Sequence, residues 1–422
     1  MKPESDEHIQ RDGKGGWPFK VRFRNSEALA ECARRCVVGA FLAALLVPGI
    51  ALSFSDKFRQ IVSTIVTGDY DSTALRQAVK DSTPLLAKAS TVYGTTLFRL
   101  QTSPNTRNGI IGKDGFIFLG DFYQSAFSQG VHRLSLSDAQ AEAWATVLDL
   151  QRRWLAARGI PLLFVVAPSP ATIYADKLPE WARLELLHPS SLDRILAASA
   201  RLGPDTPLVD LRKALIDARA KADTYSPRNT HWSDFGAWVA WRQVAEALAG
   251  RVPNFHPFGT ESLAGVVTRP DGGSDYFNLL GIDLKNPWTV YQLTTPFPAM
   301  EIDGENGKVV LSSGIPTIIQ ALPRTTRASE ASTRKKALVI RDSMGDALSP
   351  FLQATFAETQ QLRIKLSADG SRILPPDQIQ NVVDEVDRFK PDVVIYVMTE
   401  RLLVMPLEDV AQWRRILGMA GG

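Results

Sequence analysis

Three short, almost continuous apolar runs constrain the fold of this chain most. They are Pro161–Ala167, Ala337–Ile340 and Asp392–Val397. A strand with one face in water alternates apolar and polar residues, whereas a continuous apolar run is typical of a strand covered on both faces. We therefore expect these runs to form strands inside a sheet, with helices packed against each side of it.

Helical patterns lie between the apolar runs. Ser137–Gln140 is a capping-box sequence, which predicts a helix that runs to about Arg158 and ends at Gly159. Ser233 or Asp234 is expected to cap another helix, which ends near residue 250. Further helices are expected near 190–202, 211–221 and 345–357, and short strands at 116–119 and 208–210. Alternating strands and helices predict an α/β fold with an open, mostly parallel sheet and helices on both faces.

Residues 251–330 differ in character from the rest of this domain. They are rich in Pro, Gly and Thr, with short runs of strand-forming residues such as 288–291 and 308–311. We interpret this segment as a β-rich insertion within a domain that spans residues 108–422.

The N-terminal part carries a candidate membrane anchor. Residues 36–54 contain no charged side chain, and at about 1.5 Å per residue such a helix reaches roughly the 30 Å of bilayer hydrocarbon. Arg34 and Arg35 precede it, so the positive-inside rule places residues 1–35 in the cytoplasm and the main domain outside. A cleaved signal peptide and a buried core helix are the alternatives. Residues 55–107 are then expected to be a helical membrane-proximal region.

Charge and cysteine content exclude several classes of protein. A net charge of +3 without a long basic run does not indicate a nucleic-acid partner. Both cysteines, Cys32 and Cys36, lie at or before the anchor, so the exported part has no disulfide. The five histidines show no metal-ligand spacing, and we expect neither a metal nor another cofactor.

The residues that could perform chemistry are His231 and Ser343. Serine is a poor nucleophile unless a base takes its proton, and His231 is the best candidate for that base. The imidazole in turn needs a partner on its other nitrogen, and the natural position for it, two residues earlier, is Asn229. An amide cannot offset the charge of an imidazolium, and it could donate to the ring and favour the wrong tautomer.

Other residues have open assignments at this stage. Asp223, Asp234 or Asp346 could supply a carboxylate from another direction. Arg341, Asp342 and Trp232 are candidates for oxyanion or substrate binding, although Arg341 also fits a structural ion pair and the Asp342-Ser343 turn also fits a helix cap. His231 by itself also fits a structural histidine before a helix.

Five segments, in order, resemble the AlgJ/AlgX-like alginate O-acetyltransferase family, whose members contain an SGNH-hydrolase-like domain. These segments are Gly112–Leu119, Val166–Tyr174 with Leu178-Pro179, Asn229–Trp232, Asp342-Ser343 and Lys390–Arg401. Two positions depart from the family pattern. Asn229 stands where the family has an aspartate, and Arg341 stands where a glycine is often found.

The resemblance implies an SGNH-like fold with a permuted order of motifs, in which His231 precedes Ser343. It implies that Ser343 accepts the acetyl group and that His231 is the base. It also implies a protein of the bacterial inner membrane whose main domain lies in the periplasm. There it would acetylate an exported polysaccharide with acyl groups supplied by a multi-pass membrane acyltransferase.

Two other functions remain open. The chain could be a catalytically degenerate relative that binds glycan or holds the membrane acyltransferase, because of Asn229. It could also be a carbohydrate acetylesterase, in which water takes the place of the sugar hydroxyl.

Overall fold

The computed structural model describes residues 84–304 and 307–419. The chain divides into two compact units, residues 1–89 and 90–422, and the account below concerns the second unit. The predicted tail and anchor, residues 1–35 and 36–54, lie outside the described residues. Within the described ranges, no helix has both the length and the apolar character required to cross a bilayer.

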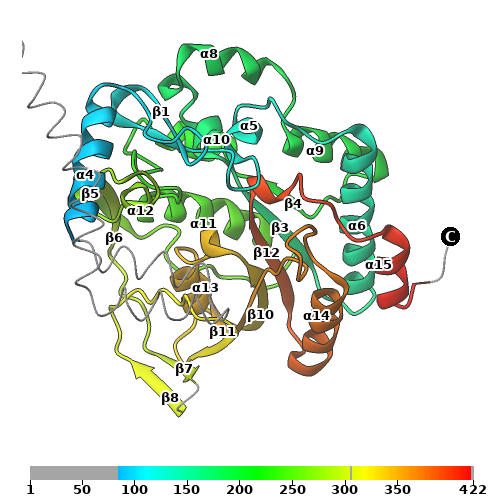
Figure 1. Ribbon diagram of the computed structural model, residues 1–422. Coiled ribbons are helices and arrows are strands. Elements are labelled where there is room, and N and C mark those ends of the chain that lie inside the picture. The colour runs from blue at the N-terminus through cyan, green and yellow to red at the C-terminus, as the bar shows by residue number, and fades with distance from the viewer. Residues whose placement is uncertain (1–83, 305–306, 420–422) are drawn as a thin grey trace, which may run out of the picture. The chain divides into compact units, whose positions relative to one another are not determined.

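An eight-stranded mixed sheet forms the centre of this unit (Figure 1). Its strands, in spatial order, are β4 (Leu208–Asp210), β3 (Leu162–Ala167), β12 (Val393–Thr399), β10 (Thr333–Arg341), β11 (Phe356–Arg363), β9 (Arg324–Ala328), β7 (Met300–Gly304) and β8 (Gly307–Leu311). The first five strands run parallel to one another, and the remaining pairings are antiparallel. β3 and β12 are buried along their whole length, as the continuous apolar runs predicted.

Helices cover both faces of the parallel strands (Figure 1). One face packs against α10 (Arg212–Ala218), α11 (Asp234–Ala249) and α13 (Ser349–Thr355). The other face packs against α6 (Asp138–Ala156), α9 (Ser191–Leu202), α14 (Pro376–Phe389) and α15 (Val410–Ile416). Each face has its own hydrophobic cluster. The side chains along a strand belong alternately to the two clusters, because successive side chains point to opposite faces. The predicted α/β class with helices on both faces is confirmed.

Smaller elements surround the carboxyl edge of the parallel strands. Two hairpins, β1–β2 (Gly109–Ile111 and Ile117–Leu119) and β5–β6 (Leu263–Gly272 and Asn286–Leu293), form separate sheets. Between β5 and β6 lies the short helix α12 (Asp275–Leu280). The remaining helices are α4 (Pro84–Arg99), α5 (Ala126–Gly130), α7 (Pro170–Ile173) and α8 (Glu180–Arg183), and the 3-10 turns are η1 (Lys113–Gly115), η2 (Ala175–Lys177), η3 (Leu184–Leu187), η4 (Ser343–Gly345) and η5 (Glu400–Leu402).

The structure corrects two expectations about these elements. The β-rich segment 251–330 is not confined to an insertion, because β7, β8 and β9 extend the main sheet. The helix expected at 345–357 is shorter, and β11 starts at Phe356. β11 has no apolar run and was not predicted. Its buried Gln360 and Gln361 accept hydrogen bonds through their side-chain oxygens, from Thr325 and Arg341 respectively, which lowers the cost of burying polar residues.

Arg341 is a structural residue, and the predicted role in oxyanion or substrate binding is wrong. Its side chain is fully buried at the end of β10. The guanidinium forms an ion pair with Asp346 and donates to the Ile319 carbonyl, to Gln361 Oε1 at 2.6 Å and to the Asp342 carbonyl at 3.1 Å. Gly345 leaves room for this side chain, because a Cβ there would lie 2.2 Å from Arg341 Cδ.

We expect Arg341→Ala to lower the free energy of unfolding by about 3–5 kcal/mol, since the change leaves the partly buried Asp346 carboxylate and the Ile319 carbonyl without their donor. Urea unfolding followed by tryptophan fluorescence measures this. Arg363→Ala is the matched control, because Arg363 pairs with Arg341 in register on β11 but is exposed. A loss of under 0.5 kcal/mol is typical of such a surface change. Equal losses in the two variants would contradict the assignment.

Candidate active site

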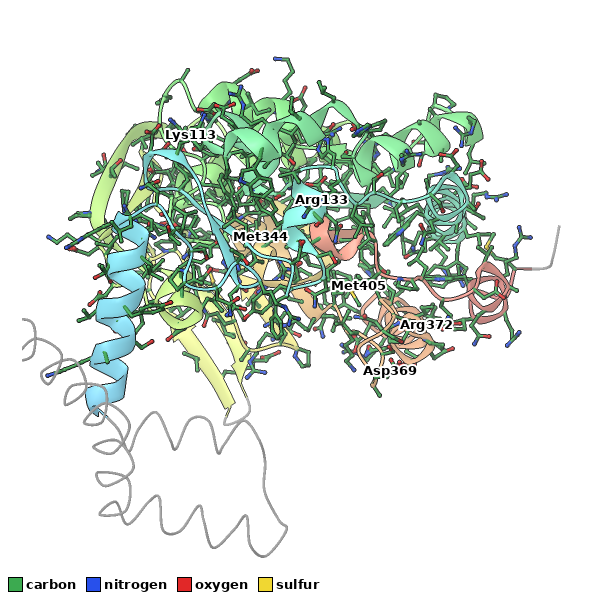
Figure 2. All side chains as sticks on the ribbon, turned by 45° about the horizontal axis from the view of Figure 1, so that its top comes forward. Lys113, Arg133, Met344, Asp369, Arg372 and Met405 are labelled. Carbon is green, nitrogen blue, oxygen red and sulfur yellow. The ribbon has the colours of Figure 1, made fainter. Side chains whose placement is uncertain are left out.

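Ser343 lies directly beyond the carboxyl end of β10, where it begins the 3-10 turn η4. The turn is held by the carboxylate of Asp342, which accepts from the Met344 amide at 2.9 Å and from the Thr399 amide at 2.8 Å. Met344 itself is buried among the densely packed side chains of the interior (Figure 2). The nucleophile turn is therefore fixed to the end of the neighbouring strand β12.

Asp342 is buried, with only 8% of its surface exposed, and burial raises the pKa of its carboxyl above the ordinary value. Both of its oxygens are engaged by backbone amides. Its predicted part in oxyanion or substrate binding is therefore wrong, and its role is to hold the turn that carries Ser343.

His231 lies in the loop before α11. The loop is closed by a bridge between Tyr225 and Trp232, and Ser233 caps the helix by accepting from the Gly236 amide at 3.1 Å. Ser233 also donates to the Asp223 carbonyl at 2.8 Å, which ties both sides of the loop together. The capping residue predicted at 233 thus also helps to set the position of the histidine.

Trp232 does not face the cleft. Only 1% of its surface is exposed, and its ring packs 6.5 Å from that of Tyr225. The predicted role of Trp232 in substrate binding is therefore wrong, and its bulk supports the loop from inside.

The structure brings His231 and Ser343 together across 112 positions of sequence. His231 Nε2 lies 2.9 Å from Ser343 Oγ, which is hydrogen-bond distance. Both residues are partly exposed. The pair therefore has the distance and access that a nucleophile and its base require.

Asn229 holds the histidine in the orientation that the pair needs. Its side-chain oxygen accepts from the His231 amide at 2.9 Å and lies 3.1 Å from His231 Nδ1, while its nitrogen donates to the Gly273 carbonyl at 2.9 Å. The His231 backbone amide and the Gly273 carbonyl together fix the side-chain amide of Asn229 with its oxygen toward the ring. Asn229 therefore accepts from Nδ1–H, and Nε2 is left free to accept the serine proton.

A carboxylate that the sequence analysis did not identify also reaches the ring. Asp275, the first residue of α12, places Oδ2 3.4 Å from His231 Nδ1. The same oxygen accepts from the Thr230 amide at 3.0 Å and from Thr230 Oγ1, which itself lies 3.1 Å from His231 Nδ1. The histidine is thus surrounded by oxygen acceptors on the side away from the serine.

Each carboxylate considered from the sequence is engaged elsewhere. Asp346 pairs with Arg341, and Asp223 accepts from the Tyr174 hydroxyl at 3.2 Å. Asp234 begins α11, and burial raises the pKa of its carboxyl. No spacing rule connects Asp275 with His231, because Asp275 arrives from the segment between β5 and β6. The sequence signal was limited to an acidic residue after the Gly272-Gly273 turn.

Burial raises the pKa of the Asp275 carboxyl, but hydrogen bonds from His231 and Thr230 outweigh burial and lower the pKa to about 2. The Asp275 carboxylate is therefore charged at neutral pH. Among the described residues, no group of three or more His, Cys, Asp or Glu side chains is arranged to hold a metal ion.

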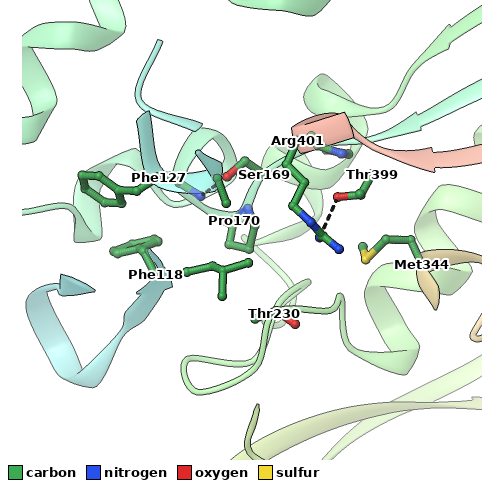
Figure 3. A pocket seen from close by; sticks show the side chains of 12 residues that line it. Phe118, Phe127, Ser169, Pro170, Thr230, Met344, Thr399 and Arg401 are labelled. Carbon is green, nitrogen blue, oxygen red and sulfur yellow. Dashed lines mark hydrogen bonds between the residues drawn. The ribbon is translucent and has the colours of Figure 1, made fainter. Parts of the chain in front are cut away.

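A small pocket lies next to the segments that carry the pair (Figure 3). Its apolar walls include Phe118, Phe127 and Pro170. Thr230 and Met344, the neighbours in sequence of the pair, also line it. Arg401 is the only charged residue in the lining, and it donates to the neutral oxygen of Thr399 at 3.3 Å (Figure 3). The pocket thus combines apolar walls with one positive charge.

Residues 110–297 match the family model described as the SGNH hydrolase-like domain of the acetyltransferase AlgX. The resemblance to the AlgJ/AlgX family is confirmed. The match includes the segment that carries Asn229 and His231.

Solved structures with a similar arrangement include two proteins of that family. The O-acetyltransferase domain of Pseudomonas putida AlgJ is 19% identical, covers 74% of this chain and 99% of its own, and has a TM-score of 0.44. Pseudomonas aeruginosa AlgX is 17% identical, covers 73% and 66%, and has a TM-score of 0.43. Bacillus cereus PatB1 is 14% identical, covers 72% and 99%, and has a TM-score of 0.49. A search of curated proteins finds no match.

We expect the stability difference between the wild type and Asp275→Asn to depend on pH. The folded-state pKa of about 2 lies below the ordinary 3.8, so the carboxylate stabilises the fold above pH 3.8, and this stabilisation is lost as the pH falls toward 2. Because the side chain is 36% exposed, solvent screening reduces the effect to about 1 kcal/mol at pH 6. Urea unfolding at pH 6, 4 and 3 measures this. A difference that stays constant with pH would contradict it.

Proposed function

We propose that this protein is a membrane-anchored, extracytoplasmic O-acetyltransferase that modifies hydroxyl groups of an exported polysaccharide. The observation that supports it best is the 2.9 Å contact between His231 Nε2 and Ser343 Oγ at the carboxyl edge of the sheet. The match of residues 110–297 to an acetyltransferase domain supports the same reaction class. The charge-free segment 36–54 supports an anchor, and a membrane acyltransferase would supply the acetyl groups.

In the first half-reaction, Ser343 Oγ attacks the carbonyl carbon of an acetyl ester or thioester, and its proton passes to His231 Nε2. The tetrahedral intermediate collapses with cleavage of the bond to the leaving group, which takes that proton from His231. The products are acetyl-Ser343 and the deacetylated donor. The Ser343 amide is not used in any hydrogen bond between described residues, and we assign it to the oxyanion.

In the second half-reaction, a sugar hydroxyl attacks the carbonyl carbon of acetyl-Ser343 and gives its proton to His231 Nε2. Cleavage of the Ser343 ester bond returns that proton to Oγ and leaves the acetyl group on the sugar. The pocket beside Thr230 and Met344 is the place where we expect the reacting groups to bind. Arg401 brings a positive charge to this pocket.

The geometry around Asn229 argues against a degenerate site. The amide oxygen faces Nδ1 and the amide nitrogen is engaged by Gly273, so the tautomer required for a base is retained. The esterase alternative uses the same serine and histidine, with water as the acceptor. Polymer acetylation in cells distinguishes the two, because loss of an esterase raises the acetyl content and loss of a transferase lowers it.

We expect Ser343→Ala to remove the acetyl groups that this protein adds to the exported polysaccharide, because no other described residue forms the 2.9 Å contact with His231 Nε2. The measurement is the O-acetyl content of the purified polymer from a deletion strain that carries each variant. Ser329→Ala is the matched control, since Ser329 is exposed on a loop and should restore the wild-type content.

Full complementation by Ser343→Ala would overturn the catalytic assignment and favour a binding or scaffold role. A higher acetyl content in the deletion strain than in the wild type would instead indicate an esterase.

A further inference from the structure

An aspartate two residues before His231 is the family's usual partner for the base, and this chain has Asn229 there. Asn229 keeps the tautomer but carries no charge. When the histidine takes the serine proton, the imidazolium needs a negative charge nearby to stabilise it. Among the described residues, a carboxylate on the separate helix α12 lies close enough to provide that charge.

We propose that Asp275 supplies the charge of the missing aspartate and acts as the positioning residue of His231. This inference rests on the proposed function and deepens it. Asp275 Oδ2 lies 3.4 Å from His231 Nδ1, closer than the 4 Å limit of an ion pair. In this arrangement Asn229 fixes the tautomer of His231, and Asp275 balances the positive charge of the imidazolium.

Thr230 couples Asp275 to the ring. Its amide donates to Asp275 Oδ2 at 3.0 Å, and its hydroxyl donates to the same oxygen. The hydroxyl proton is therefore used toward Asp275, and the lone pairs of Thr230 Oγ1 face Nδ1 of His231, 3.1 Å away, where the single Nδ1–H is shared with Asn229 Oδ1. Thr230 thus connects the Asp275 carboxylate to the ring through hydrogen bonds and also holds the carboxylate in place.

Asn229 also helps to position Asp275. Its amide nitrogen donates to the Gly273 carbonyl at 2.9 Å, and Asn286 Nδ2 donates to the same carbonyl at 2.7 Å. Gly273 lies two residues before Asp275, so these bonds hold the start of α12 against the histidine loop. An aspartate at 229 would lose the donation to Gly273 and would place a second carboxylate beside Asp275.

Two other charged groups act on His231 from elements packed nearby. Asp342, on the nucleophile turn, attracts the protonated ring, and its own pKa is influenced by His231. Arg401 lies near Asp342 and Asp275, and its positive charge opposes the stabilisation that these carboxylates give to the imidazolium. Asp342 is saturated by two backbone amides, whereas Asp275 faces the ring directly. We therefore expect Asp275 to be the main source of stabilisation for the imidazolium.

The test compares full-length wild type, Asp275→Asn, and the exchange variant Asn229→Asp/Asp275→Asn. Cleavage of p-nitrophenyl acetate gives kcat and KM for each protein. Asp275→Asn keeps the shape and the acceptor for Thr230 but removes the charge. We expect its kcat to fall roughly tenfold to a hundredfold with little change in KM, because the charge acts on the imidazolium formed during the reaction and not on substrate binding.

The exchange variant restores a carboxylate beside Nδ1 at position 229, and Asn286 still donates to the Gly273 carbonyl. We expect it to recover a large part of kcat, with KM close to that of the wild type. Asn229→Asp alone should not exceed the wild type, because the carboxylate is already present. Asp271→Asn is the matched control: it removes an exposed carboxylate from the same segment and should change neither value.

An unchanged kcat in Asp275→Asn, where ester cleavage depends on Ser343, would overturn the inference. Failure of the exchange variant to recover, with Asn229→Asp alone more active than the wild type, would also overturn it. Ester cleavage that persists unchanged in Ser343→Ala would instead overturn the proposed acetyl transfer, on which the inference rests.

Discussion

The buried carboxylate of Asp342 is the interaction on which the site depends. It receives the Met344 amide from its own turn and the Thr399 amide from the end of β12. Parallel strands end at the same edge of the sheet, so one carboxylate can join two of them there. Burial makes the charged form costly, but two amide donors offset part of that cost. The serine thus rests on two strands that the hydrophobic core holds rigid.

The histidine is positioned by quite different means. It lies in a loop whose neighbours Asn229 and Thr230 contact the segment between β5 and β6 through Gly273 and Asp275. Half of the site therefore depends on the central sheet and half on a peripheral hairpin with its short helix. A change in that hairpin would move the carboxylate and the base together, whereas the serine would stay in place.

Sequence reasoning succeeded where local rules apply. The buried strands β3 and β12 follow from continuous apolar runs, and the caps of α6 and α11 from Ser137 and Ser233. It failed for β11, since a buried strand containing Gln360 and Gln361 has no apolar signature. It also offered Arg341 and Trp232 as binding candidates, although both are buried, and for Arg341 the alternative of a structural ion pair holds. Residue type alone does not distinguish a buried arginine with partners from an exposed one.

The sequence by itself determined the α/β class, the nucleophile and base candidates Ser343 and His231, and the absence of an aspartate at position 229. Those features depend on periodicity and on neighbouring residues. Only the tertiary structure decided which carboxylate approaches the base, because Asp275 is brought to His231 by the packing of a hairpin rather than by spacing along the chain. A contact between segments that are distant in sequence depends on how the whole chain packs, and no short sequence pattern predicts it.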